Sequence, residues 1–179
     1  MSQASEIVAF WHDAGYERWF KRDDAFDAEF KRRFHEAHMA AARGEYEAWM
    51  ESAEGALALL ILLDQFPRNC FRGCAHSYAT DGLARSYARR AIDAGFDLQV
   101  ETALRMFLYL PFEHSETMAD QDYAMELFAR TGNDELMKYA VLHRDLIARF
   151  GRFPHRNAAL GRESTQEELD YLASGGFSG

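Results

Sequence analysis

The sequence contains few cysteines and prolines. Of its 179 residues, two are cysteine and three are proline. Cys70 and Cys74 stand four apart, which is not the spacing of a redox pair, and no second pair is present to complete a zinc site. Two thiols in a chain without a secretory leader predict a reduced, cytosolic protein. The scarcity of proline leaves room for long helices.

Targeting and membrane signals are also absent. The first residues, MSQASEIVAFWHD, contain no basic segment followed by an apolar run, so they do not form a signal peptide. The longest apolar stretch, Ala56–Leu63, is far shorter than the roughly 20 residues that a membrane-spanning helix needs. We therefore expect a cytoplasmic protein with no membrane segment.

The charge balance is acidic. A net charge of −9 opposes a general affinity for nucleic acid or for anionic lipid, because the field of the whole molecule repels both. With 48% hydrophobic and 27% charged residues, the composition is that of a globular protein. The chain length predicts one domain over residues 1–179, with a frayed tail at about 174–179.

Hydrophobic periodicity predicts an all-α protein. Residues Phe26, Phe30 and Phe34 form one apolar stripe at helical spacing, and no segment has the alternation of a strand. Pro67 is expected to end a helix at Phe66, and Thr165 is expected to open the last helix through a capping box. About eight helices in antiparallel pairs are predicted, over residues 5–14, 23–43, 52–66, 80–94, 100–110, 115–130, 134–150 and 165–173.

The familiar catalytic and cofactor motifs are missing. The sequence contains no Gly-x-Ser-x-Gly elbow, no GxxxxGK or GxGxxG loop, and no His-Glu-x-x-His pair. We therefore predict neither a cofactor nor a metal ion. Polar residues that could act together are instead concentrated in three stretches, Asp64–Gly73, Tyr109–Gln121 and His143–Glu163.

These stretches resemble a bacterial family known as domain of unknown function 924. Its motifs stand here as LDQFPRN at 63–69, YLPFEHSE at 109–116, and RFGRFPHRN at 149–157 followed by LGRESTQEE at 160–168. The resemblance covers nearly the whole chain. It implies an all-helical fold similar to tetratricopeptide-type stacks of helix pairs, and it implies no established activity.

Arginine is unusually frequent in the third stretch. From His143 to Arg162 there are five arginines and two histidines against one acid, Asp145. Guanidinium groups suit carboxylate or phosphate ligands, so the stretches could meet in an anion-binding pocket. The alternative is that these arginines form structural ion pairs and cap helix carbonyls. The predicted ligand-binding residues are Asp64, Gln65, Arg68, Asn69, Arg72, Arg152, His155, Arg156, Asn157 and Arg162.

The second stretch suggests acid–base chemistry. Glu113 and His114 are adjacent, and His143 lies on the apolar face of its own helix, where it could join them. The same residues could be read as metal ligands, but their spacing matches no established metal motif. A histidine on an apolar stripe can also be a core residue bonded to a carbonyl.

Two functions therefore stay open. The first is a helical binding protein whose pocket of Arg, His and Glu side chains holds a small anionic ligand or an acidic peptide. The second is an enzyme that uses Glu113, His114 and His143 as acid–base groups on an anionic substrate. The sequence favours the first, because it shows no nucleophile, metal triad or cofactor loop.

Overall fold

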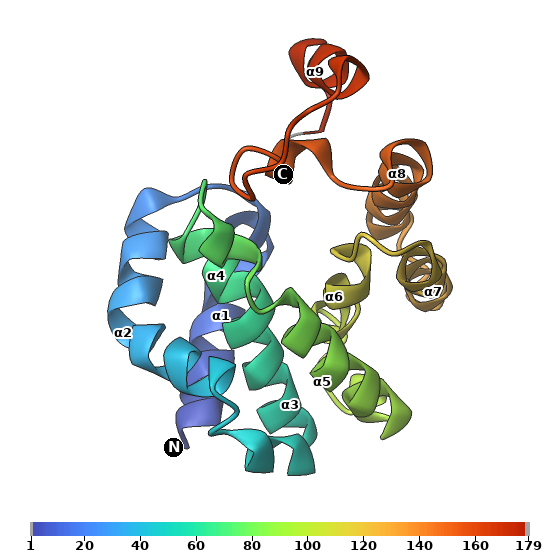
Figure 1. Cartoon of the computed structure of the whole chain (residues 1–179). Coiled ribbons are helices and arrows are strands. Elements are labelled where there is room, and N and C mark those ends of the chain that lie inside the picture. The colour runs from blue at the N-terminus through green and yellow to red at the C-terminus, as the bar shows by residue number, and fades with distance from the viewer. Residues whose placement is uncertain (1, 178–179) are drawn as a thin grey trace. The chain divides into compact units, whose positions relative to one another are not determined.

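The regular structure of the chain is helical. The computed structural model describes residues 2–177, and in that range it contains no strand. The all-α class with about eight helices is confirmed, whereas the likeness to tetratricopeptide arrays stays a prediction. The α-helices are α1 (Gln3–Phe20), α2 (Asp24–Ala42), α3 (Ala53–Leu60), α4 (Phe66–Cys70), α5 (Asp81–Asp93), α6 (Leu110–Glu113), α7 (Met118–Ala129), α8 (Asp134–Phe150) and α9 (Gln166–Ala173) (Figure 1).

Shorter helical turns connect these helices. The 3₁₀ turns are η1 (Glu47–Glu51), η3 (Ala75–Tyr78), η4 (Phe96–Leu98), η5 (Arg105–Leu108) and η6 (Pro154–Arg156), and η2 (Ile61–Gln65) is a π-helical segment. The prediction of one helix over residues 100–110 is therefore wrong in its bounds. Only η5 forms there, and α6 begins before Pro111, whose missing N–H costs little in the first turn of a helix.

Contacts divide the chain into two compact units. The first runs from the N-terminal residues to Arg72 and again over His76–Pro111, and the second holds Gly73–Ala75 and the chain from Phe112 onward. In the first unit, α1 and α5 both pack on α3. In the second, α7 and α8 pack along each other, and α9 packs on η6.

Aromatic rings fill the core of the first unit. Trp11 of α1 is fully buried, with its ring centroid 5.3 Å from that of Phe30 and 5.4 Å from that of Phe107. Phe30 in turn contacts Phe66 edge-on at 5.0 Å. The predicted phenylalanine stripe of α2 is thus its buried face, and such ring pairs add to the free energy that burial itself supplies.

The helix that contains Pro67 does not end at Phe66. Instead α3 passes through η2 into α4 as one continuous helical path, so the predicted end is wrong. The N–H of Phe66 donates to the carbonyl of Ile61, five residues back. This wider π turn accommodates the proline, which has no N–H to donate.

Side chains supply donors to carbonyls in the π segment. Proline and the π turn together remove backbone donors, and a buried carbonyl without a donor is costly. Three side chains donate instead: His38 to Leu62 at 2.8 Å, Thr80 to Leu63 at 2.5 Å, and Arg68 to Asp64 at 2.9 Å. The π segment is therefore held by residues from α2, the start of α5 and α4.

The capping box predicted at Thr165 is confirmed. The Thr165 hydroxyl accepts from the N–H of Glu168, and the Glu168 carboxylate accepts from the N–H of Thr165. Beyond α9, Phe177 donates its N–H to the Tyr171 hydroxyl at 2.9 Å. Of the tail predicted to fray, residues 178–179 lie outside the described part of the chain.

Candidate functional site

Arg68 lies between two aspartates of the first unit. Its guanidinium contacts Asp64 at 2.9 Å and both carboxylate oxygens of Asp81 at 2.8 and 3.0 Å. The Gln65 amide donates to the other oxygen of Asp64 at 2.6 Å. Burial alone would lower the pKa of Arg68, but the two carboxylates raise it above its ordinary value. This group is a buried ion-pair network.

Asn69 and Arg72 fasten α4 to the start of α2. Both donate to Asp27, Asn69 at 2.8 Å to one carboxylate oxygen and Arg72 at 2.8 Å to the other. Arg72 therefore already has an anionic partner. No local pattern predicts this contact, because Asp27 precedes Arg72 by 45 residues.

A pair of histidines next to the π segment was not predicted. The ring of His38 is fully buried, and its Nε2 lies 2.8 Å from Nε2 of His76. Because Nδ1 of His38 donates to the Leu62 carbonyl, Nε2 of His38 must accept and His76 must donate. Burial lowers the pKa of His38, which favours this neutral arrangement. No sequence motif marks the pair.

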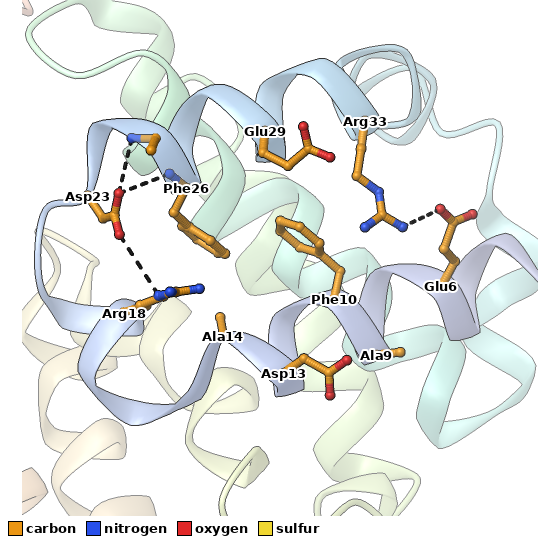
Figure 2. A pocket seen from close by; sticks show the side chains of 11 residues that line it. Glu6, Ala9, Phe10, Asp13, Ala14, Arg18, Asp23, Phe26, Glu29 and Arg33 are labelled. Atoms are coloured by element: carbon orange, nitrogen blue, oxygen red, sulfur yellow. Dashed lines mark hydrogen bonds and ion pairs between the residues drawn. The ribbon is translucent and has the colours of Figure 1, made fainter.

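A groove between α1 and α2 in the first unit has a volume of about 470 Å³ (Figure 2). Phe10 and Phe26 stack at 5.1 Å and form its apolar floor. Arg33 pairs with Glu6 at 2.6 Å at one end of the groove, and Arg18 lies 3.9 Å from a capping aspartate at the other. None of the predicted site residues lines it.

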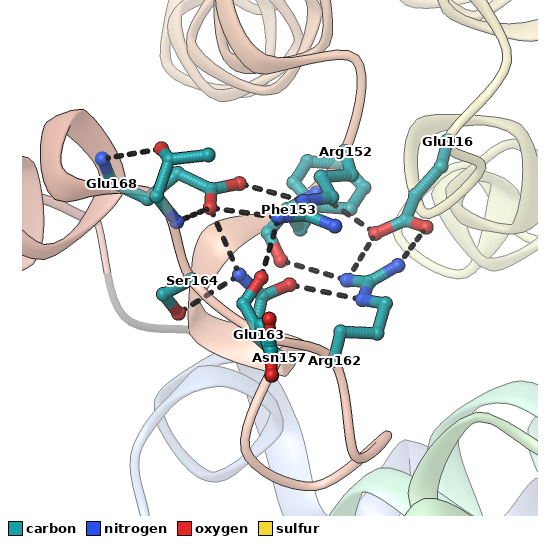
Figure 3. Close-up of polar contacts among 9 residues, drawn as sticks. Glu116, Arg152, Phe153, Asn157, Arg162, Glu163, Ser164 and Glu168 are labelled. Atoms are coloured by element: carbon teal, nitrogen blue, oxygen red, sulfur yellow. Dashed lines mark hydrogen bonds and ion pairs between the residues drawn. The ribbon is translucent and has the colours of Figure 1, made fainter.

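In the second unit, Arg152 and Arg162 are also held by carboxylates (Figure 3). Arg152 contacts both oxygens of Glu168 at 2.6 and 2.8 Å, and Arg162 contacts both oxygens of Glu116 at 2.6 and 3.0 Å. Asn157 joins the two pairs, since its oxygen accepts from Arg162 at 2.9 Å and its amide donates to Glu168 at 3.2 Å. The network fixes the loop between α8 and α9.

The other predicted site residues of the second unit form a separate group from this ion-pair network. We call Glu113, His114, His143, His155 and Arg156 the histidine cluster. His143 belongs to the buried face of α8. Glu113 ends α6 and His155 and Arg156 belong to η6, so three separate segments contribute.

Glu113 and His143 form the centre of the histidine cluster. Nδ1 of His143 lies 2.8 Å from the carbonyl oxygen of Tyr139 and 3.3 Å from Oε1 of Glu113. Both side chains are buried, His143 with 7% of its surface exposed and Glu113 with 3%. Gln121 of α7 positions Glu113 by donating to its backbone carbonyl at 2.7 Å.

Aromatic rings and cations surround this pair. The His114 ring is 6.2 Å from that of His143, and the Arg156 guanidinium lies 4.3 Å from the centre of the Phe153 ring. Phe177 packs 4.8 Å from His143 and 5.3 Å from His155. The segment after α9 therefore covers part of the histidine cluster.

The environment keeps His143 neutral. Its pKa is lowered to about 3, chiefly by burial and also by His114, Arg156 and His155, while the hydrogen bond to the Tyr139 carbonyl acts in the opposite direction. At neutral pH the imidazole therefore carries one proton. Glu116, in the neighbouring network, also has a lowered pKa: burial alone would raise it, but the hydrogen bonds from Arg162 and from the N–H of Phe153 lower it.

The predicted site residues thus fall into two groups. Asp64, Gln65, Arg68, Asn69 and Arg72 belong to the first unit, and the others belong to the second. A single pocket lined by both groups stays a prediction. Within the described residues, no three His, Cys, Asp or Glu side chains are placed to hold a metal ion. No described helix is long and apolar enough to cross a membrane.

Comparison with known proteins gives two findings. The sequence profile of a family described as bacterial protein of unknown function (DUF924) matches residues 7–176. A solved structure of a protein of unknown function, ATU0120 from Agrobacterium tumefaciens, is 54% identical and superimposes with a TM-score of 0.93, covering 96% of this chain and 97% of that one. None of the curated proteins matches the chain.

Proposed function

The chain belongs to the DUF924 family of bacterial proteins, and we propose that its histidine cluster binds a small anionic ligand. One observation carries the proposal: segments distant in the sequence bring Glu113, Arg156 and two further imidazoles close to the buried ring of His143. Imidazole and guanidinium groups are the side chains that most often donate to carboxylate and phosphate oxygens.

The environment of His143 supports an anion in particular. Burial lowers its pKa most, and His114, Arg156 and His155 lower it as well, so three basic side chains contribute positive potential beside this ring. An anion beside these groups would gain from that potential, and it would gain more than in water because the surroundings are buried. Arg152 and Arg162 would contribute indirectly, by holding the loop that carries η6.

Burial favours a small ligand over a peptide. Arg156 has 5% of its surface exposed and His143 has 7%, so a long chain could not reach both along an open face. Phosphate or a short carboxylic acid fits these limits. We place the protein in the cytoplasm, where the thiols of Cys70 and Cys74 would remain reduced.

Thermal denaturation with added anions tests the proposal. Millimolar phosphate or a short carboxylic acid should raise the melting temperature by mass action, since a ligand at about 100 times its Kd adds about 2.7 kcal/mol. His114→Ala and His155→Ala should each weaken binding about tenfold, which corresponds to about 1.4 kcal/mol.

The matched control is Arg149→Ala. This arginine is also in the third stretch, but it is half-exposed and paired with Glu167 on the surface. It should leave anion binding unchanged, because it adds no group to the histidine cluster. Equal loss of binding in all three variants would indicate a nonspecific charge effect, and no anion-dependent shift in the wild type would refute the proposal.

Acid–base catalysis is a second candidate, favoured by the contact between Glu113 and His143. A carboxylate next to Nδ1 orients the ring and the lone pair of its Nε2. A panel of phosphate and carboxylate esters should then show turnover that His143→Ala abolishes and His76→Ala, in the first unit, leaves intact. Turnover that both variants retain would contradict this candidate.

A further inference from the structure

We infer that α1 is the docking site for a basic amphipathic helix of a partner protein. The inference concerns the first unit, so it goes beyond anion binding by the histidine cluster and does not depend on it. It rests on two grooves that share Ala9 of α1, and on the acidic side chains that line them.

The second groove is also built on α1. It has a volume of about 370 Å³ and is formed by α1, the start of α3 and the segment between η4 and η5. Val8, Leu57 and Leu104 supply most of its apolar lining. Both grooves fall in the range of ligand-sized pockets, about 300–1,000 Å³, so each has room for a large apolar side chain.

The periodicity of α1 explains the two grooves. Residues three or four apart share a face of a helix, so Val8 and His12 line the second groove. In the same way Phe10 and Asp13 line the first, as Figure 2 shows. Ala9 lies between these two rows and lines both grooves. Because its side chain is short, a second helix can cross α1 closely there and place side chains on both sides.

The carboxylates beside the grooves indicate a basic partner. Asp13 and Glu101 each contact His12, at 3.4 and 3.2 Å. Glu54 accepts from the Ser5 hydroxyl at 2.7 Å. Within residues 2–177, none of these three carboxylates contacts an arginine or a lysine. A partner that brings lysine or arginine side chains would therefore gain new ion pairs.

The arginines of the first groove do not reverse this balance. Arg33 pairs with Glu6 at 2.6 Å and Arg18 lies 3.9 Å from Asp23, so each already faces a carboxylate. In the described part of the chain, six carboxylates and two arginines line the two grooves together. This surplus of negative charge would repel an acidic partner and attract a basic one.

An exposed leucine extends the apolar surface beside the second groove. Leu98 has 71% of its surface exposed, and it directly precedes Gln99 and Val100, which line the groove. Single exposed apolar residues are common, but one next to an apolar groove adds to the area that a partner can cover. Apolar grooves with acidic surroundings suit a helix that has apolar anchors at i, i+3, i+4 and i+7 and basic residues beside them.

Fluorescence polarisation with labelled synthetic peptides tests the inference. The probe is a peptide of about 18 residues, or five helical turns, with leucine at the anchor positions and lysine on the opposite face. The control peptide has the same composition in scrambled order, so it has the same charge but no apolar face. The full-length protein should bind the probe at least about tenfold more tightly than the scrambled peptide.

Two charge variants show whether the probe docks at the grooves. The double variant Asp13→Asn/Glu101→Gln should weaken binding about fivefold, as expected for the loss of exposed ion pairs. The charge-matched control is Glu36→Gln/Glu167→Gln, which should leave binding unchanged. Glu36 contacts a neighbouring histidine at 3.2 Å as Asp13 does, but neither Glu36 nor Glu167 lines a groove.

A bulky residue at the crossing point supplies a second test. Ala9→Trp should weaken binding of the probe at least about tenfold, because the indole ring would occupy the place where the partner helix crosses α1. Ala28→Trp is its control, since Ala28 is exposed on α2 and lines neither groove. If Ala9→Trp does not fold, the charge variants decide.

The other outcomes would overturn the inference. Equal binding of the probe and the scrambled peptide, or equal loss in both double variants, would indicate attraction by the whole acidic molecule. Hexylamine that binds as tightly as the probe would indicate a site for small amines. A dimer in analytical ultracentrifugation that Ala9→Trp dissociates would show that a second copy covers α1. Full binding by a folded Ala9→Trp variant, or no binding of the probe, would contradict docking at α1.

Discussion

Arg68→Ala should destabilise the first unit by about 3–5 kcal/mol, the range found when one partner of a buried ion pair is removed. The variant takes the guanidinium away from Asp64 and Asp81, whose side chains are 1% and 11% exposed. It also removes the donor to the Asp64 carbonyl in the π segment. Urea denaturation followed by tryptophan fluorescence reports on this unit, because Trp11, Trp19 and Trp49 all lie in it.

The control for this prediction is Arg90→Ala. Arg90 pairs with Glu47 at 2.7 Å, but both side chains are about half exposed, so the pair should contribute less than about 1 kcal/mol. Arg68→Lys should fall between the two, since lysine retains the charge but cannot contact both oxygens of Asp81. Similar stability of the Arg68→Ala and Arg90→Ala variants would contradict the assignment of Arg68 as a structural residue.

Glu168→Ala should destabilise the second unit by about 3 kcal/mol, the low end of the same range because Arg152 is 28% exposed. Glu168 accepts from Arg152, from Asn157 and from the N–H of Thr165, so one substitution removes three contacts. Hydrogen exchange measured by mass spectrometry should show faster exchange in α9 and in the loop after α8.

The neighbouring residue gives a matched control. Glu167 is 62% exposed and pairs with Arg149 on the surface, so Glu167→Ala should change the free energy of unfolding by less than about 1 kcal/mol. Equal protection of α9 in the Glu167→Ala and Glu168→Ala variants would show that the network does not hold the loop.

The contribution of Glu168 should also depend on pH. The hydrogen bond from Arg152 is the main cause that lowers the pKa of Glu168 to about 2, below the value of about 4.3 expected in the unfolded chain. Its stabilising contribution is therefore complete above about pH 4.3 and is lost as the pH falls toward 2. Over that window the stability difference between wild type and Glu168→Ala should shrink.

Local patterns in the sequence predicted much of the fold. The apolar stripe of α2 and the capping box at Thr165 are set by residues close together in the chain, so spacing alone reveals them. The position of His143 on the apolar face of α8 also predicted that its ring would be buried. The structure then places it 3.3 Å from Glu113, which precedes it by 30 residues.

The ion pairs could not be predicted in the same way. The carboxylate partners of Arg72 and Arg162 lie 45 and 46 residues away in the sequence. Acidic residues are so common in this chain that the sequence does not indicate which of them pairs with a given arginine. The passage of the helix through Pro67 depends on a π turn and on donors from His38 and Thr80. These are tertiary contacts, and they override the local preference for a helix end.

The tautomer of His143 is the most direct test of the account. Long-range proton–nitrogen NMR spectra of the ¹⁵N-histidine protein at neutral pH should show a neutral ring with the proton on Nδ1. Titration with phosphate should then change the Nε2 resonance of His143 and leave that of His76 unchanged. A charged ring, a proton on Nε2, or a His143 signal that phosphate does not affect would contradict the proposed site.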